Sequence, residues 1–222
     1  MKRAVFLILI LSVTFIAAMP AAASTDFETK GSSALIMDPE TGQVLYEKNP
    51  YKKMEPASIT KTMVMILIQE AIEKGEIHPD DMVTISRHAQ SMYGSQIFLQ
   101  AGERVTVNDL LRAVAISSAN DATVALAEHH SGSEEAFVRA MNRRAEELGM
   151  ENTNFINSTG LPDDDHYTTA YDIALMSQEF LKFPELLEMT KVWMEYLDLP
   201  GRQAMLVNFN RLVSSYPGVD GI

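Results

Sequence analysis

The pattern of apolar and polar positions after residue 32 predicts a β-hairpin. Residues Ala34–Asp38 and Gln43–Glu47 form two short runs rich in strand-forming side chains. The four residues between them, Pro39–Gly42, are typical of a tight turn, because proline and glycine supply the backbone angles that turns require. Two runs this short and this closely connected are expected to pair as antiparallel strands.

A buried helix is predicted to follow the hairpin. It extends from about Ser58 to Lys74, and Gly75 is its stop signal. Within it, Met63–Ile68 are six consecutive apolar residues. A helix that is apolar on nearly every side lies in the core of a protein. Ser58 therefore stands at the start of a helix that we expect to be enclosed by others.

The rest of the chain is predicted to be mainly helical, with strands returning near its end. Further helices are predicted at Thr106–Ser117, Asp121–His130, Glu134–Leu148 and Thr168–Phe183, the last ended by Pro184, and strands at Lys191–Leu199 and Ala204–Phe209. Thr106, three residues before Asp109, has the pattern of a helix N-cap. A hairpin, a helical block and returning strands favour a single α+β domain, with the helices packed on an antiparallel sheet.

The first 23 residues differ in character from the rest of the chain. Lys2 and Arg3 give a basic start, Ala4–Ala18 is an almost unbroken apolar run, and Ala21–Ala23 supplies small residues. This layout is typical of a cleaved secretory signal. The alternative is a transmembrane anchor, but the run is shorter than the roughly 20 residues needed to span a bilayer. We expect cleavage after residue 23 and one domain over residues 24–222.

Composition excludes several classes of function. The chain carries a formal net charge of −12, and binding to nucleic acid relies on neutralising phosphates, so nucleic acid is not an expected partner. There is no cysteine, which removes disulfides and thiolate chemistry. His129 and His130 are adjacent on a predicted helix and point about 100° apart, a poor pair for zinc. We therefore expect neither a metal nor a cofactor.

A candidate nucleophile and base open the predicted buried helix. Ser58 and Lys61 are three residues apart, which places both side chains on one helix face. Serine needs a neighbouring base, and lysine can serve when burial and the helix dipole favour its neutral form. By itself this spacing is common, and Ser58 as a simple helix cap with a solvated Lys61 is the alternative.

A second polar group lies about 60 residues later, at the junction of two predicted helices. Ser118 and Asn120 flank Ala119, so both side chains can face one substrate. A Ser-x-x-Lys motif followed by Ser-Asp-Asn and Lys-Thr-Gly is the signature of β-lactamases and penicillin-binding proteins. Here Ala119 stands in the middle position instead of aspartate.

Several segments in the same order resemble the low-molecular-weight penicillin-binding proteins, the D-alanyl-D-alanine carboxypeptidases of peptidase family S11. The matching segments are Pro56–Lys61, Ser118–Ala122, Val124–His129, Ala136–Phe137, Met141–Asn142, Thr159–Pro162, His166–Asp172 and Tyr216–Ile222. The resemblance implies a serine β-lactamase/transpeptidase-like α+β fold. It covers nearly all of the chain after residue 32, and several motifs in order are far more specific than any one.

The resemblance also implies roles and partners. Ser58 would be the acylated nucleophile, Lys61 its proton acceptor, Ser118 a proton relay to the leaving amine, and Asn120 a group that holds the substrate backbone. The substrate would be a peptidoglycan stem peptide ending in D-Ala-D-Ala, and β-lactam antibiotics would acylate Ser58 as covalent inhibitors. Such an enzyme is exported and works in the cell envelope of a bacterium.

One departure from the family pattern concerns the third motif. In the family, Lys-Thr-Gly directly follows the stretch that resembles Val219–Ile222, where this sequence ends. The expectation is a catalytic domain that is incomplete at its C-terminus, without the second oxyanion donor or the family's membrane anchor, so that the activity of the 222-residue chain is in doubt. Two alternatives remain, a class A-like β-lactamase and a non-catalytic cell-wall-binding remnant.

Overall fold

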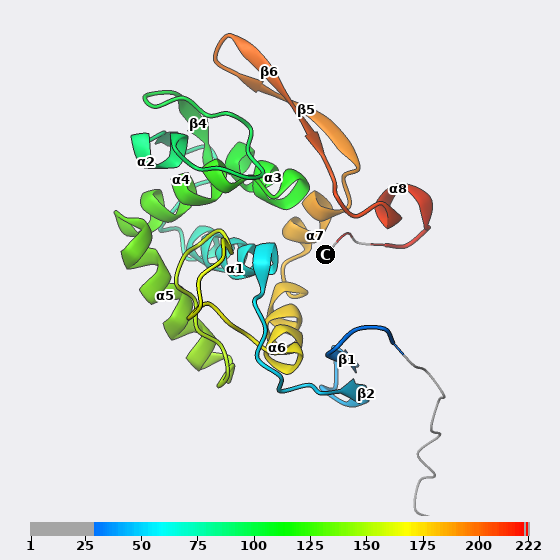
Figure 1. The fold of residues 1–222 in the computed structure, drawn as a ribbon. Coiled ribbons are helices and arrows are strands. Elements are labelled where there is room, and N and C mark those ends of the chain that lie inside the picture. Colours follow the sequence, from blue (N-terminus) through cyan, green and yellow to red (C-terminus); the bar gives the residue numbers. More distant parts are fainter. Residues whose placement is uncertain (1–28, 220, 222) are drawn as a thin grey trace, which may run out of the picture. The chain divides into compact units, whose positions relative to one another are not determined.

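The computed structural model describes residues 29–219 and residue 221 (Figure 1). The proposed signal over residues 1–23 lies outside the described residues. Strands β1 (Ala34–Met37) and β2 (Val44–Lys48) form the predicted antiparallel hairpin, with a bulge between Ile36 and Met37. Strand β1 packs against helix α6 (Ala170–Phe180).

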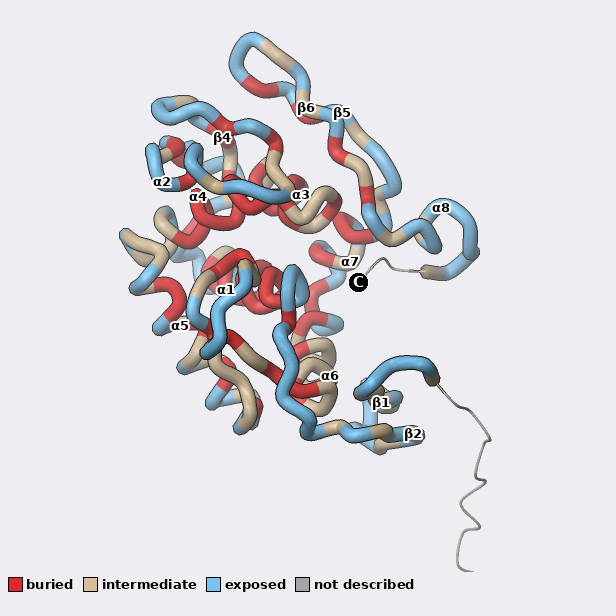
Figure 2. The backbone as a smooth tube through the Cα atoms, viewed as in Figure 1, coloured by how far each residue is buried: buried red, intermediate tan, exposed pale blue. Residues whose placement is uncertain are grey.

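The predicted buried helix is confirmed. A short 3₁₀ turn, η1 (Ala57–Ile59), leads directly into α1 (Thr60–Glu73). The residues from Met63 to Ile68 are all buried, and α1 contacts α3 (Val107–Ser117), α4 (Asn120–Ser131), α5 (Glu134–Glu147) and α6. Figure 2 shows α1 as a mainly red segment, which marks it as part of the core.

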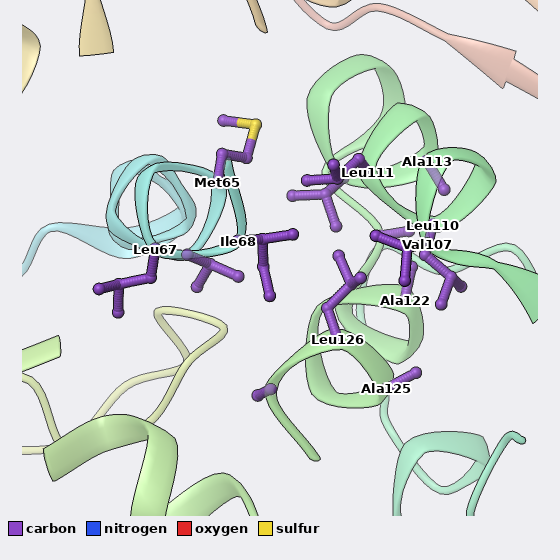
Figure 3. Packing of buried hydrophobic residues seen from close by; sticks show 14 of the residues in the cluster. Met65, Leu67, Ile68, Val107, Leu110, Leu111, Ala113, Ala122, Ala125 and Leu126 are labelled. Carbon is purple, nitrogen blue, oxygen red and sulfur yellow. The ribbon is translucent and has the colours of Figure 1, made fainter. Parts of the chain in front are cut away.

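Three of the predicted helices lie close to their expected positions, and the first has the expected N-cap. Helix α3 begins after Thr106, whose hydroxyl accepts a hydrogen bond from the Asp109 backbone N–H at 3.0 Å. Helix α5 begins after Ser133, which accepts in the same way from Ala136. In the core, Ile68 points from α1 toward Leu111 of α3 and Leu126 of α4 (Figure 3). This packing holds α1 against α3 and α4.

The structure corrects the end of the last predicted helix. Helix α6 stops at Phe180, and Pro184 begins a new helix, α7 (Pro184–Thr190). Proline is tolerated at the first position of a helix because the N–H that it lacks has no partner there. Four short elements were not predicted: β3 (Met82–Thr84), α2 (Arg87–Gln90), β4 (Arg104–Thr106) and α8 (Leu212–Ser215).

The described strands form three separate two-stranded sheets. They are β1–β2, β3–β4 and β5 (Met194–Leu199) with β6 (Arg202–Val207), all antiparallel. The last pair confirms the two strands predicted near the end of the chain. The helical block and the antiparallel pairing agree with the sequence, but within the described residues the strands do not join into one sheet. No helix in this part of the chain is long and apolar enough to cross a membrane.

Candidate active site

The predicted nucleophile and base lie side by side at the start of the buried helix. Ser58 lies in η1 and is exposed, whereas Lys61, in the first turn of α1, is only 2% exposed. The Lys61 Nζ atom is 3.2 Å from Ser58 Oγ. An exposed hydroxyl beside a buried amine is the arrangement that a serine nucleophile with a lysine base requires.

The environment of Lys61 favours its neutral form. Burial lowers the pKa of Lys61 from its usual 10.5 to about 8, because a charged ammonium loses hydration there. At neutral pH roughly a tenth of such amines are neutral, several hundredfold more than for an exposed lysine. The one further hydrogen bond of Nζ goes to the Thr159 carbonyl oxygen at 2.7 Å. The amine is therefore available as a base and is held in place by a second hydrogen bond.

A tightly ordered loop supplies that carbonyl. The Asn157 Oδ1 atom accepts hydrogen bonds from the backbone N–H groups of Thr159, Gly160 and Leu161 at 3.2, 2.8 and 3.1 Å. Gly160 has φ +78°, and a Cβ atom at this position would lie 1.8 Å from the Ala57 carbonyl oxygen. The loop therefore touches the residue before the nucleophile as well as the base.

Ser118 occupies a strained position at the same site. It follows α3 with φ 52° and ψ 37°, a left-handed conformation that costs a non-glycine residue on the order of 1–2 kcal/mol. Its Oγ atom is buried and has no hydrogen-bond partner among the described residues. Backbone strain combined with an unsatisfied buried hydroxyl is typical of a residue with a functional role, such as hydrogen bonding to a substrate.

Three of the four predicted site residues meet in one cavity. Ser58, Lys61 and Ser118 line a space of about 390 Å³. Its other lining residues are Ile59, Thr62, Met65, Val114, Ala115, Ile173, Ser177, Thr190 and Gly221. The size and the mixed apolar and polar lining fit a small-molecule or peptide substrate. The fold thus brings Ser58, Lys61 and Ser118 together, and their catalytic roles stay a prediction.

Asn120 is placed differently from expectation. It begins α4 two residues after Ser118, but its side chain does not line the cavity in the described structure. Its Nδ2 atom donates to the Tyr93 carbonyl oxygen at 2.6 Å, and its backbone N–H donates to the Ser95 carbonyl oxygen at 2.7 Å. Asn120 therefore ties the neighbouring loop to the helix junction.

Two further side chains support the site and had no role in the sequence-based prediction. The Asp121 carboxylate accepts from the backbone N–H groups of Ile97 and Leu99, at 3.0–3.2 Å, which orders the loop next to Asn120. His166 Nε2 lies 2.9 Å from Thr60 Oγ1, and burial lowers the pKa of His166. Both residues lie in segments that the resemblance covers, but only the folded chain shows their partners.

Groups of acidic and histidine side chains suited to a metal ion are not found within residues 29–219 and 221. The site as described consists of a serine, a lysine and a second serine around a cavity, with backbone groups ordered by Asn157 and Asp121.

Comparison with known proteins places these features in a family context. Residues 19–222 match the family model for peptidase S11, described as D-alanyl-D-alanine carboxypeptidase. The chain is 48% identical over 200 residues to D-alanyl-D-alanine carboxypeptidase DacF of Bacillus subtilis. This match covers 90% of this chain and 51% of DacF. It is 39% identical over 164 residues to DacA of Haemophilus influenzae, covering 72% of this chain and 41% of DacA. The chain thus spans about half the length of the curated relatives that it matches.

Solved structures show the same fold. The D-alanyl-D-alanine carboxypeptidase DacD from Francisella tularensis superposes with a TM-score of 0.83 at 29% identity, over 95% of this chain and 62% of that chain. Penicillin binding protein 5 from Haemophilus influenzae superposes with a TM-score of 0.80 at 34% identity, over 86% of this chain and 56% of that chain. These neighbours confirm the predicted serine β-lactamase/transpeptidase-like fold class.

Proposed function

The chain belongs to the D-alanyl-D-alanine carboxypeptidase family, peptidase S11, and on that premise we propose that it removes the terminal D-alanine from peptidoglycan stem peptides through an acyl-enzyme on Ser58. The observation that carries the proposal is the 3.2 Å separation of Ser58 Oγ and a buried Lys61 amine with a pKa of about 8. Serine is a weak nucleophile, and this pair gives it a base that is partly neutral near neutral pH.

The proposed reaction assigns one task to each of Ser58, Lys61 and Ser118. Lys61 takes the proton from Ser58 Oγ as that oxygen attacks the carbonyl carbon between the two D-alanines. The Ser58 backbone N–H is one donor to the oxyanion that forms. The peptide C–N bond then breaks, and Ser118 passes a proton to the amine of the departing D-alanine. Water hydrolyses the resulting ester and frees Ser58.

The substrate-holding role of Asn120 is proposed from the family resemblance, because its side chain does not line the cavity of the described structure. Its Nδ2 atom is already bonded to the Tyr93 carbonyl, so Oδ1 is the atom that would accept from a substrate N–H. The Ser95 carbonyl and the loop around it are held by the backbone of the same residue. We propose that a substrate peptide binds along this loop, and that β-lactams acylate Ser58 because they occupy the same cavity.

Export is part of the same proposal. Peptidoglycan lies outside the cytoplasmic membrane, and a signal over residues 1–23 would deliver the enzyme there. The basic start, the apolar run and the small residues before residue 24 support it.

The direct test uses the full-length product of the gene. A peptide ending in D-Ala-D-Ala should lose one D-alanine, whereas the same peptide ending in L-Ala-L-Ala should remain intact. Labelled penicillin should form a stable adduct, and mass spectrometry of the digested protein should place it on the peptide containing Ser58. An adduct on any other residue, or equal cleavage of both peptides, contradicts the proposal.

The pH dependence of acylation is expected to report the Lys61 amine. The base acts only when it is neutral, so the rate should increase about tenfold per pH unit below its pKa and level off above about pH 8. The measurement is the second-order rate constant for labelling by fluorescent penicillin between about pH 6 and pH 10. A rate that is constant or decreasing from pH 6 to pH 8 would exclude Lys61 as the base.

A further inference from the structure

An acidic side chain outside the cavity is connected to the Lys61 amine. The Glu134 Oε1 atom accepts from the Ser158 backbone N–H at 2.9 Å and from Ser158 Oγ at 2.7 Å. The carbonyl of the next residue, Thr159, accepts from Lys61 Nζ at 2.7 Å. A short series of bonds therefore leads from Glu134 through Ser158 and Thr159 to the base.

The residues that make this connection are largely buried. Ser158 is completely buried and Thr159 is 2% exposed. Glu134 is the first residue of α5, its side chain is 14% exposed, and its Oε2 atom lies 3.5 Å from His88 Nε2. His88 Nδ1 in turn lies 3.1 Å from Glu128 Oε1 on α4. The Glu134 carboxylate is therefore held by two hydrogen bonds at Oε1, and it cannot rotate away from Ser158 without breaking them.

The geometry of an amine explains why this connection matters. A neutral lysine amine has two N–H groups and one lone pair, and the lone pair must face the Ser58 hydroxyl to accept its proton. Donation of one N–H to the Thr159 carbonyl removes the free rotation of the amine. A misplaced carbonyl would leave the amine present but wrongly oriented, and errors of about 1 Å can cost up to about a hundredfold in rate.

We propose that Glu134 is a positioning residue for acylation, which anchors Ser158 so that the Thr159 carbonyl directs the Lys61 amine toward Ser58. The inference rests on the proposed function, because it concerns the same acylation step. Glu134 touches neither the substrate nor the reacting atoms. It acts through the backbone of the loop that holds the base.

A purely structural explanation must be separated from this role. A carboxylate in the first turn of a helix stabilises that helix through its dipole, and Glu135, the next residue, is equally placed for this effect. Glu135 is fully exposed. Glu135→Ala is therefore a matched control, because it removes the same charge from the same turn without touching Ser158.

The two variants are expected to differ in rate and in pH profile. Glu134→Ala should lower penicillin acylation about tenfold, while Glu135→Ala should leave it unchanged. The Thr159 carbonyl stabilises the ammonium form more than the amine, so its displacement lowers the pKa of Lys61 and moves the midpoint of the pH profile below its original value. Glu134→Gln keeps an oxygen acceptor for Ser158 and should restore most of the rate and the original midpoint.

Other titratable groups do not produce this shift. Burial is the one cause of the lowered Lys61 pKa among the described residues. His166 is hydrogen-bonded to Thr60 beside Lys61, and burial lowers the pKa of His166. On the far side of Glu134 the facing groups are His88 and, beyond it, Glu128. Both groups are unchanged in Glu135→Ala, and the Glu135 carboxylate also acts on His88, so the control likewise removes a negative charge near His88.

The experiment measures both acylation and the pKa of the Lys61 amine, the latter from ¹³C chemical shifts of labelled lysine. A lower pKa and rate in Glu134→Ala, but not in Glu135→Ala, support the inference, and equal values in the two variants overturn it. If the unaltered protein is not acylated at all, the proposed function fails, while the pKa comparison still decides whether Glu134 positions Lys61.

A second variant is used if Glu134→Ala does not fold. Ser158→Ala loses only the hydrogen bond from the serine hydroxyl to Glu134, so it should show a smaller change in rate and pKa in the same direction. No change in Ser158→Ala would overturn the proposal.

Discussion

Replacing Lys61 with methionine is expected to lower the rate of Ser58 acylation on the order of a thousandfold, because general base catalysis typically contributes a factor of about 10² to 10⁴. Methionine fills most of the volume of the lysine side chain and suits a residue that is 2% exposed. The variant should therefore fold, and its melting temperature should stay the same or increase, since a buried amine is replaced by an apolar group. Penicillin labelling and thermal melting measure the two effects.

Two further variants serve as controls for penicillin labelling of the Lys61→Met protein. Ser58→Ala should remove labelling completely, which sets the baseline below which Lys61→Met cannot fall. Lys74→Met, at the other end of the same helix, alters a side chain that is 61% exposed and should leave labelling unchanged. Rapid labelling of the Lys61→Met protein would show that another group takes the proton from Ser58.

Replacing Gly160 with alanine is expected to lower the free energy of unfolding more than any of the other proposed substitutions, and also to abolish acylation of Ser58. The new Cβ atom would lie 1.8 Å from the Ala57 carbonyl oxygen, 2.4 Å from its carbon and 3.0 Å from Thr60 Oγ1. The backbone next to the nucleophile must move, at a cost of about 1–3 kcal/mol, in addition to about 1–2 kcal/mol for alanine in the left-handed region. The same movement displaces the Thr159 carbonyl from Lys61.

Gly149 provides a control with the same backbone conformation. Its φ is also +78°, but a Cβ atom there would meet only Leu175 Cδ1 at 4.0 Å. Gly149→Ala should therefore cost only the backbone strain, about 1–2 kcal/mol, and should retain acylation. Denaturant unfolding and penicillin labelling of both variants separate strain from collision. Equal effects at the two glycines would mean that the contact with Ala57 does not hold the site together.

Local signals in the sequence were sufficient for most of the helices and for the first hairpin. The run Met63–Ile68 identified a core helix because its lack of any polar side fits only a buried position. Thr106 was identified as a cap because its hydrogen bond to Asp109 spans only three residues. The predicted end of α6 was wrong because a proline can end one helix and also begin the next. From the sequence, Pro184 indicates only that a helix is interrupted there.

Part of the candidate site could be predicted from the sequence, and the rest depends on the tertiary structure. Ser58 and Lys61 could be paired from sequence because three residues of helix fix their distance, and the resemblance added Ser118 and Asn120. Only the tertiary structure brought Thr159, 98 residues away, to the Lys61 amine and placed Glu134 behind it. The lowered pKa of Lys61, the unsatisfied Ser118 hydroxyl and the contact of Gly160 with Ala57 likewise depend on burial and on packing between distant segments. Such effects arise from which segments meet when the core closes, and no local pattern of residues encodes that.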